Sequence, residues 1–356
     1  MNQLRPIEVA MLNPPLSKKT LFFAAMMLIV LVASIGYWQH LQTDHNTKIN
    51  QPQLPTKDPT APITPLKPIA NLDPKVVSLG QQLFFDKRLS KDNSLSCASC
   101  HNLQTGGDDN MPKSVGINGQ IGALNAPTVF NTAYNIRQFW DGRAKSLEEQ
   151  AQGPIHNPVE MGSNWQEVIS KLTFDKAFIK QYKQSFSLPI SAQNLAFALA
   201  TFERSLVLVD SPFDRWLKGD VNAISGQAKR GYEKFKSYGC IACHQGAAVG
   251  GGLFEKIGTL NDYFADRGGN ITPADLGRYN LTGEEDQRHE FKVPSLRTAS
   301  MTAPYFHDGS VWQLREAIAK MGWYQLGIKL TPEDIGDIEV FIQSLAGKIP
   351  PLEKTP

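Results

Sequence analysis

Two short motifs contain all four cysteines of this 356-residue chain. Each motif reads Cys-x-x-Cys-His, and the members are Cys97, Cys100 and His101, then Cys240, Cys243 and His244. On a helical turn, residues three and four apart share one face, so two thiols and an imidazole can point at one flat ligand. The spacing predicts covalent attachment of a c-type haem at each motif, with the histidine as an axial ligand of iron. Redox dithiols or a zinc site fit less well, because a histidine directly follows both cysteine pairs.

The two motifs lie within an internal repeat. A Gly-x-x-x-Phe segment that begins at Gly80 precedes the first motif, and one that begins at Gly231 precedes the second. After each motif, a segment of equal length runs from a proline to an Asp-Gly pair, at Pro127–Gly142 and at Pro294–Gly309. Matches in the same register predict two cytochrome-like units of common origin.

The repeats differ at a position that decides iron chemistry. Met321 lies 13 positions after Asp308, and the equivalent position in the first repeat is Pro154, which cannot ligate iron. A thioether opposite histidine fills the sixth site of the iron and raises its potential. We therefore expect a saturated electron-transfer haem on His244 and Met321, and an open haem on His101. Other methionines are alternative sulfur ligands: Met111, Met161 and Met301.

The start of the chain predicts export. Residues 20–38 are apolar and uncharged, which is long enough for a membrane-spanning helix, and positive charges in 1–19 predict a cytoplasmic N-terminus. A cleaved signal peptide is the alternative. Residues 39–70 are polar and then proline-rich, which is typical of a semi-extended linker.

The remainder shows helix signals and no convincing strand pattern. The predicted fold is all-α, with two cytochrome c-like domains, each with one covalently bound haem, after the N-terminal transmembrane helix. We expect the domains at 71–209 and 210–346, followed by a tail at 347–356. A helix is expected over 192–207, after Ser191 as N-cap. The net charge of +2 and the lack of a basic run indicate no nucleic-acid partner.

Several segments resemble the bacterial diheme cytochrome c peroxidase family, which also includes the MauG-type enzymes. They are CASCHNLQTGG (97–107), NAPTVFN (125–131), QFWDGRA (138–144), GPIHNPVEM (153–161), SPFDRWLKGD (211–220), TAPYFHDG (302–309) and Met321-Gly322. The resemblance covers nearly everything from Asp73 to Leu345. It implies that the His101 haem reacts with hydrogen peroxide. The His244 haem would accept electrons from a small donor protein, a cytochrome c or a cupredoxin.

The same resemblance assigns site residues. Glu160 and Gln150 match the distal pocket, with Glu160 as the proton shuttle, and Trp140 matches the tryptophan between the haems. Met321 matches the axial methionine, where MauG-type enzymes have a tyrosine. Three positions match those that hold a calcium ion through oxygen atoms: Asn125, Thr302 and Pro304. The alternatives are a MauG-like enzyme that oxidises a partner protein, and a non-catalytic diheme electron-transfer cytochrome.

One position departs from the family pattern. Many members carry a Gly-His pair whose imidazole blocks the peroxidatic iron until the other haem is reduced, and here the pair is Gly116-Ile117. Isoleucine cannot ligate iron, so we expect the His101 haem to rest open or water-bound. His156 is the alternative blocking ligand. The expected location is the periplasm, either anchored to the inner membrane or free after signal cleavage, and dimers are common in the family.

Overall fold

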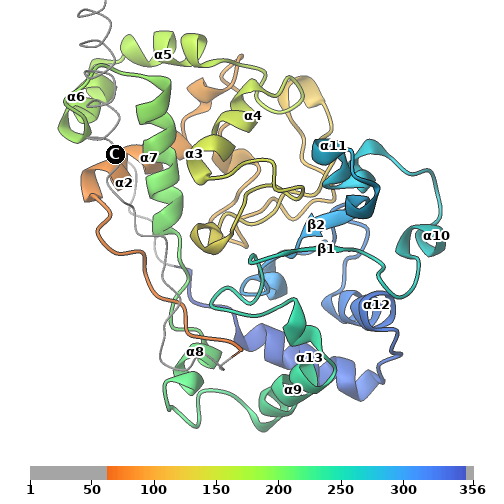
Figure 1. Cartoon of the computed structure of the whole chain (residues 1–356). Coiled ribbons are helices and arrows are strands. Elements are labelled where there is room, and N and C mark those ends of the chain that lie inside the picture. Colours follow the sequence, from red (N-terminus) through yellow and green to blue (C-terminus); the bar gives the residue numbers. More distant parts are fainter. Residues whose placement is uncertain (1–61, 350–356) are drawn as a thin grey trace, which may run out of the picture. The chain divides into compact units, whose positions relative to one another are not determined.

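The computed structural model describes residues 62–349 (Figure 1). Its α-helices are α2 (Pro74–Phe84), α3 (Leu147–Gln150), α4 (Gln152–His156), α5 (Trp165–Thr173), α6 (Lys176–Ser185), α7 (Ala192–Ser205), α8 (Pro212–Leu217), α9 (Gly226–Ser237), α10 (Tyr263–Arg267), α11 (Tyr279–Thr282), α12 (Leu314–Leu326) and α13 (Pro332–Ser344). Both haem motifs begin as short 3-10 turns, at Cys97–Ser99 and Cys240–Ala242. Long stretches between the helices are loops, and these loops carry most of the site residues.

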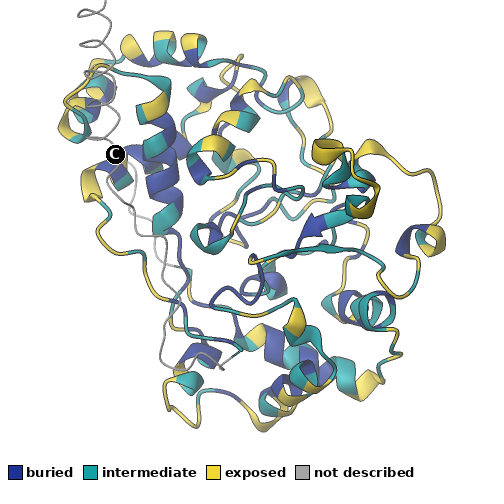
Figure 2. Ribbon diagram, viewed as in Figure 1, coloured by how far each residue is buried: buried dark blue, intermediate teal, exposed yellow. Residues whose placement is uncertain are grey.

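Two helix pairs organise two hydrophobic cores. In the first, α2 packs along α7, and a Cβ on Gly80 would collide with the Ala198 carbonyl of α7. In the second, α9 packs along α13, and a Cβ on Gly231 would collide with the Asp337 carbonyl. Figure 2 shows the facing sides of α2 and α7 as buried. Each repeated glycine therefore allows one helix to approach the backbone of its partner closely.

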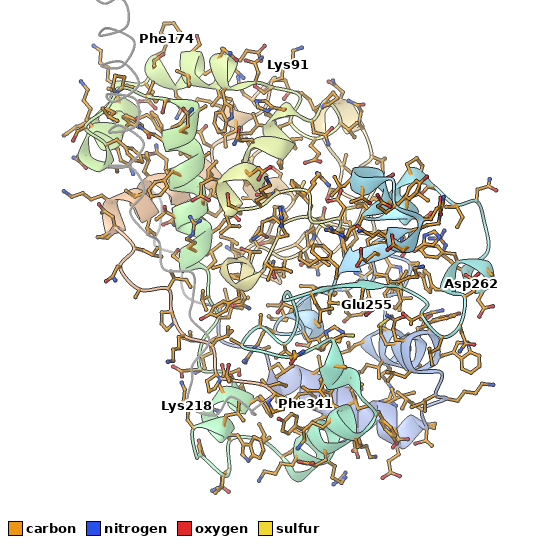
Figure 3. The ribbon with its side chains drawn as sticks, in the orientation of Figure 1. Lys91, Phe174, Lys218, Glu255, Asp262 and Phe341 are labelled. Atoms are coloured by element: carbon orange, nitrogen blue, oxygen red, sulfur yellow. The ribbon has the colours of Figure 1, made fainter. Side chains whose placement is uncertain are left out.

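The phenylalanine of each Gly-x-x-x-Phe segment has the same role in its core. Phe84 meets Phe202 of α7 edge-on, with ring centroids 5.3 Å apart, and Phe235 meets Phe341 of α13 at 5.1 Å. Figure 3 labels Phe341 among the side chains of this second helix pair. Such aromatic pairs stabilise a core beyond the area that they bury. The repeat in the sequence thus corresponds to a repeated packing arrangement.

The helix that the sequence predicts over 192–207 is α7. It ends at Ser205, and the Ser191 hydroxyl accepts a hydrogen bond from Asn194 N at 3.2 Å, as expected of an N-cap. Leu195, Leu199 and Phe202 of α7 are buried in the first core. The face of α7 that carries these apolar residues is therefore the face that packs.

The predicted fold class, all-α with an N-terminal transmembrane helix, is wrong. Strands β1 (Phe254–Lys256) and β2 (Glu290–Lys292) form an antiparallel pair in which Glu255 lies opposite Phe291. Strands of three residues are too short to give a readable alternation of polar and apolar positions. Across residues 62–349, no helix has both the length and the apolar character that a membrane crossing needs. The span predicted at 20–38 lies outside the described residues.

The end of the predicted linker is built into the folded body. Ile63 and Leu66 are each 2% exposed, and Ile63 belongs to the second core. Gly246 N donates to the Pro62 carbonyl at 2.8 Å, and the Arg297 guanidinium donates to the Thr64 carbonyl at 3.0 Å. A proline-rich composition did not indicate this burial, because the apolar residues that anchor the segment are few and widely spaced.

Candidate functional site

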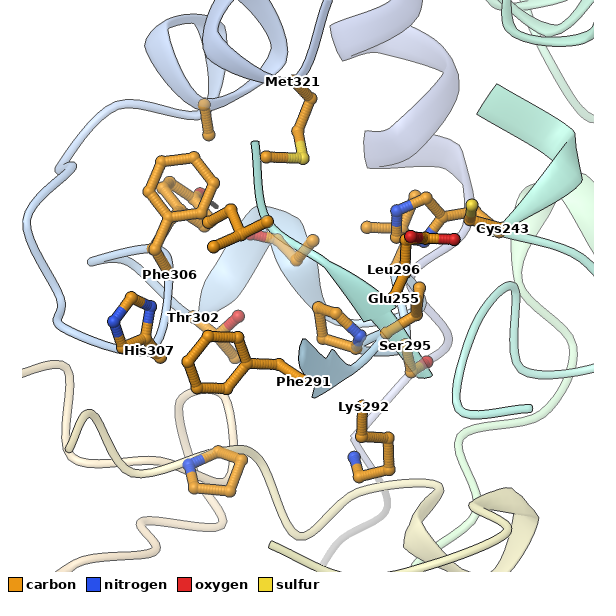
Figure 4. A pocket seen from close by; sticks show the side chains of 18 of the residues that line it. Cys243, Glu255, Phe291, Lys292, Ser295, Leu296, Thr302, Phe306, His307 and Met321 are labelled. Atoms are coloured by element: carbon orange, nitrogen blue, oxygen red, sulfur yellow. Dashed lines mark hydrogen bonds between the residues drawn. The ribbon is translucent and has the colours of Figure 1, made fainter. Parts of the chain in front are cut away.

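A cavity of about 280 Å³ lies beside the second Cys-x-x-Cys-His motif. Cys240, Cys243 and His244 line it, and Met321 reaches it from α12. In Figure 4, Met321 and Cys243 border this cavity from different elements. The sequence placed these four residues around one haem, and the structure brings them to one cavity.

The walls of this cavity suit a flat, largely apolar cofactor. Aliphatic side chains from the loop before α12 and from helices α12 and α13 line it, among them Leu296, Leu314, Ile318 and Ile342. Burial lowers the pKa of His244 to about 4, although the carbonyls of Val249 and Pro294 act in the opposite direction. The ring is therefore neutral at physiological pH, which is the form that ligates iron. The donor set and the apolar walls fit a haem.

In the first motif, the histidine ring has a hydrogen-bond partner. The Nδ1 atom of His101 lies 3.1 Å from the Gly107 carbonyl oxygen, and burial lowers the pKa of the ring. A hydrogen bond at Nδ1 fixes the orientation of the imidazole and leaves Nε2 for a metal. Burial raises the pKa of the Cys97 and Cys100 thiols, as it does for the thiols of the second motif. These residues fit a second haem.

Glu160 lies in the loop that follows α4, close to the first motif. Asn157 Nδ2 donates to Glu160 Oε1 at 2.6 Å, and the carboxyl group is half-buried. Burial raises the pKa of Glu160, although Asn157 and the Arg143 guanidinium act against this. The Glu160 carboxylate is also one of the charges that raise the pKa of Cys100. The structure thus places this carboxyl, a predicted catalytic residue, near Cys100 of the first motif.

Ile117 lies beside Glu160. Its backbone N–H donates to the Glu160 carbonyl at 2.8 Å, and its side chain is 4% exposed. A Cβ on Gly116 would collide with the Val159 carbonyl, so glycine lets this segment approach the Glu160 loop. The position that many family members fill with histidine is therefore buried beside the distal carboxyl.

Gln150 is the other residue assigned to the distal pocket, and Pro154 is the repeat equivalent of Met321. Both lie on the two short helices before Glu160. Gln150 ends α3 and Pro154 lies in α4, both half-buried. His156, the alternative blocking ligand, is exposed and packs edge-on against Trp165. Met161 is buried in the first hydrophobic core, which is the role expected of most methionines.

Trp140 lies at the boundary between the two repeats. Its indole Nε1 donates to the Asn125 carbonyl at 2.8 Å, and its ring meets Phe291 of β2 edge-on at 6.3 Å. It also lines the cavity of the second motif. The repeat equivalent of Trp140 is His307. The residue before each of them adopts a positive φ: 67° for Phe139 and 69° for Phe306. Such a backbone is unusual for a bulky residue, so the same strained turn is built in both repeats.

The three positions assigned to calcium line one part of this cavity: Asn125, Thr302 and Pro304. Asn125 Nδ2 donates to the Met111 carbonyl at 2.8 Å, which leaves Oδ1 as the side-chain oxygen for a cation. Asn110 Nδ2 donates to the carbonyls of Met301 and Ala303, and so fixes the turn that carries Thr302 and Pro304. Oxygen groups of this kind suit calcium.

The sequence did not single out Asp108, which lies near this turn. It is 1% exposed, and neither carboxyl oxygen has a hydrogen-bond partner of normal geometry within residues 62–349. Asp108 Oδ1, Thr302 Cγ2 and the Met301 carbonyl crowd around the Gly106 backbone. Burial raises the pKa of Asp108 to about 7. An unpaired buried carboxyl is costly, and it favours a cation nearby.

A second acidic cluster is already neutralised by the protein itself. Asp275 and Asp308 both accept from the Arg267 guanidinium, at 2.7 and 3.0 Å, and His307 Nε2 lies 2.9 Å from Asp275. Burial alone would raise the pKa of Asp275, but the hydrogen bonds from Arg267 and His307 hold it below its usual range. This cluster packs the loops around β2, and it leaves no unpaired charge for a metal ion.

Known proteins resemble this chain over most of its length. Residues 74–222 match the family described as di-haem cytochrome c peroxidase. The chain is 45% identical over 291 residues to a cytochrome c peroxidase of Escherichia coli, a match that covers 82% of this chain and 62% of that protein. It is also 45% identical over 279 residues to a cytochrome c551 peroxidase of Pseudomonas aeruginosa, covering 77% and 80%. The chain therefore spans less than two thirds of the first relative and most of the second.

One solved structure extends the comparison to the fold. It is a MauG-like protein associated with microbial copper homeostasis, with a TM-score of 0.70 and 26% sequence identity. The match covers 82% of this chain and 95% of that one, which is too much for the likeness to be confined to one repeat.

Proposed function

The chain belongs to the di-haem cytochrome c peroxidase family, and we propose that it reduces hydrogen peroxide to water in the periplasm with electrons from a cytochrome c or a cupredoxin. The observation that carries this proposal is the asymmetry between equivalent positions of the two repeats. Met321 lines the cavity of the His244 motif, whereas Pro154 takes the equivalent position in the first repeat. The His244 haem would therefore have a sulfur ligand, and the His101 haem would keep a coordination position for peroxide.

Each motif would hold its haem through residues that the structure groups together. The cysteine pairs would form the thioethers, His101 would ligate the first iron, and His244 and Met321 would ligate the second. When bound, the haem irons supply the electron storage and the peroxide-binding site that no side chain offers. The chain supplies ligand geometry, proton transfer and a path between the sites.

Glu160 is the residue that we assign to proton transfer. Reduction of one peroxide to two waters consumes two protons and two electrons. Asn157 fixes Glu160 Oε1, so Oε2 is the oxygen that can take a proton from the substrate and return it to the departing oxygen. A raised pKa brings this carboxyl nearer to working pH. Gln150 is the assigned second polar group of the pocket.

Trp140 is the residue that we assign to electron passage between the two sites. Hydrogen bonds from its indole to Asn125 and from Lys292 N to its carbonyl, at 2.8 and 2.7 Å, hold it between the repeats. The ring also packs against Phe291, so its loss should reduce stability as well as electron transfer.

The test uses the holoprotein in two redox states. Hydrogen peroxide is added to the half-reduced and to the fully oxidised protein, and haem absorbance is followed in a stopped-flow instrument. We expect rapid reoxidation of the half-reduced protein after peroxide is added. If both irons are six-coordinate and no reoxidation follows, the peroxidase proposal fails and an electron-transfer cytochrome is left.

We also propose a calcium ion bound by Asn125 Oδ1 and the carbonyls of Thr302 and Pro304. The unpaired Asp108 carboxyl close to this turn supports the choice of a cation. Calcium content of the purified holoprotein should fall in an Asn125→Leu variant. Equal calcium in both proteins would contradict the assignment.

Ile117 should leave the first iron open in the resting oxidised enzyme. We expect a high-spin signal from the His101 haem in electron paramagnetic resonance, and activity without prior reduction. An Ile117→His variant should convert this signal to low spin, because the position is buried beside Glu160. Ile121→His is the matched control, since Ile121 belongs to the same loop and is 59% exposed. A low-spin bis-histidine signal from the wild-type protein would contradict the expectation.

A further inference from the structure

Lys292 is a buried cation that has no acidic partner among residues 62–349. The residue is 7% exposed, and burial lowers the pKa of its ammonium group to about 8 with no carboxylate acting against this. The acidic residue that lines the same cavity is Glu255, and it points away from Lys292 (Figure 4). A buried charge without a partner is strongly unfavourable, and an anion bound beside Lys292 in the holoprotein would remove this cost.

The position of Lys292 has an equivalent in the first repeat, Asn125. Lys292 lies two positions before Pro294, as Asn125 lies two before Pro127. Lys292 N donates to the Trp140 carbonyl at 2.7 Å, and Asn125 N donates to the carbonyl of His307, the equivalent of Trp140, at 2.8 Å. The two residues therefore occupy matching places, each bonded to the other repeat.

The matching places differ in how they provide positive charge. Asn125 offers a neutral amide oxygen, and the proposed calcium ion would bring the charge. Lys292 brings an ammonium group of its own. It lines the same cavity as His244 and Met321. A haem bound there would bring two propionate carboxylates with it. A propionate is the anion that this cavity would receive with its cofactor.

We propose that Lys292 is the fixed counter-charge of a propionate of the haem on His244. The inference rests on the haem site of the proposed function. A positive charge close to a haem favours the reduced iron, which carries one positive charge less. Lys292 therefore raises the potential of the electron-accepting haem and helps it to take electrons from the donor.

The experiment compares three variants with the wild-type holoprotein. Lys292→Met removes the charge and keeps much of the side-chain length, and Lys292→Arg keeps the charge. Lys176→Met removes a charge from exposed Lys176 in α6, and so is the matched control. Haem content and far-ultraviolet circular dichroism are measured first. The potentials of both haems are then measured by spectroelectrochemistry between pH 6 and 8, about the range in which a propionate that loses its partner would titrate.

We expect Lys292→Met to lower the potential of the His244 haem and to steepen its pH dependence, because the unpaired propionate takes up a proton when the iron is reduced. Lys292→Arg should stay near wild type, and Lys176→Met should change neither haem. Two intact haems with unchanged potentials in Lys292→Met would overturn this inference and leave the proposed function standing. A shift confined to the His101 haem would also overturn it. Absence of haem from the wild-type protein would instead refute the proposed function.

Discussion

Replacement of Glu160 by glutamine is expected to lower peroxide turnover by about 10²–10⁴-fold, the usual contribution of a positioned acid–base group. Glutamine keeps the size of the side chain and can still accept the hydrogen bond from Asn157, so both haems should remain bound. What is lost is a group that takes and returns a proton. Steady-state peroxide consumption, measured with haem content and spin state, checks this.

The pH profile separates a catalytic role of Glu160 from a structural one. Burial raises the pKa of this carboxyl, so the deprotonated form that accepts a proton is lost as pH falls through a value above the ordinary range of glutamate. Wild-type turnover should decline on that acidic side, and Glu160→Gln should lack this decline. Glu233→Gln is the control, because Glu233 is exposed on α9 and pairs with Lys236. Full activity in Glu160→Gln would remove Glu160 from the mechanism.

The repeat could be predicted from the sequence because it has a physical cause. Gly80 and Gly231 must lack a Cβ where two helix backbones meet, and Phe84 and Phe235 fill matching places in two cores. The haem-attachment residues could also be predicted from the sequence. The two cysteines and the histidine of a Cys-x-x-Cys-His motif lie within five consecutive residues, so their relative positions are set locally. Local constraints of this kind are visible in one sequence.

Contacts between distant segments could not be predicted in the same way. Strands β1 and β2 are 33 residues apart and only three residues long, so neither gives a periodic signal. Lys292 and Asp108 appear in the sequence as ordinary charged residues. Only the fold shows that both are buried and that, among residues 62–349, neither side chain has an oppositely charged partner. The repeat in the sequence does make Lys292 the equivalent of Asn125. Only the fold shows that each of these residues bonds to the other repeat, Lys292 to Trp140 and Asn125 to His307.

Loss of Arg297 is expected to have the largest effect on stability. Its side chain is fully buried, and its guanidinium pairs with the equally buried Asp214 at 2.7 Å. The same group donates to the carbonyls of Ala247, three residues after the second haem motif, and of Thr64, in the segment before α2. Arg297→Met should lower the free energy of unfolding by about 3–5 kcal/mol, because Asp214 is left as an unpaired buried charge.

The double variant Arg297→Met/Asp214→Leu should recover much of this loss, because it removes the unpaired charge together with its partner. The control is Arg315→Met, which breaks the exposed pair with Glu339 and should change the free energy of unfolding by about 0.2–1 kcal/mol. Guanidinium unfolding of the holoproteins, followed by circular dichroism, measures all three. If Arg297→Met loses no more stability than Arg315→Met, then the buried pair does not hold the Thr64 segment and the Ala247 loop together. If the double variant is as unstable as the single one, the lost hydrogen bonds to the two carbonyls, and not the charge on Asp214, account for the effect.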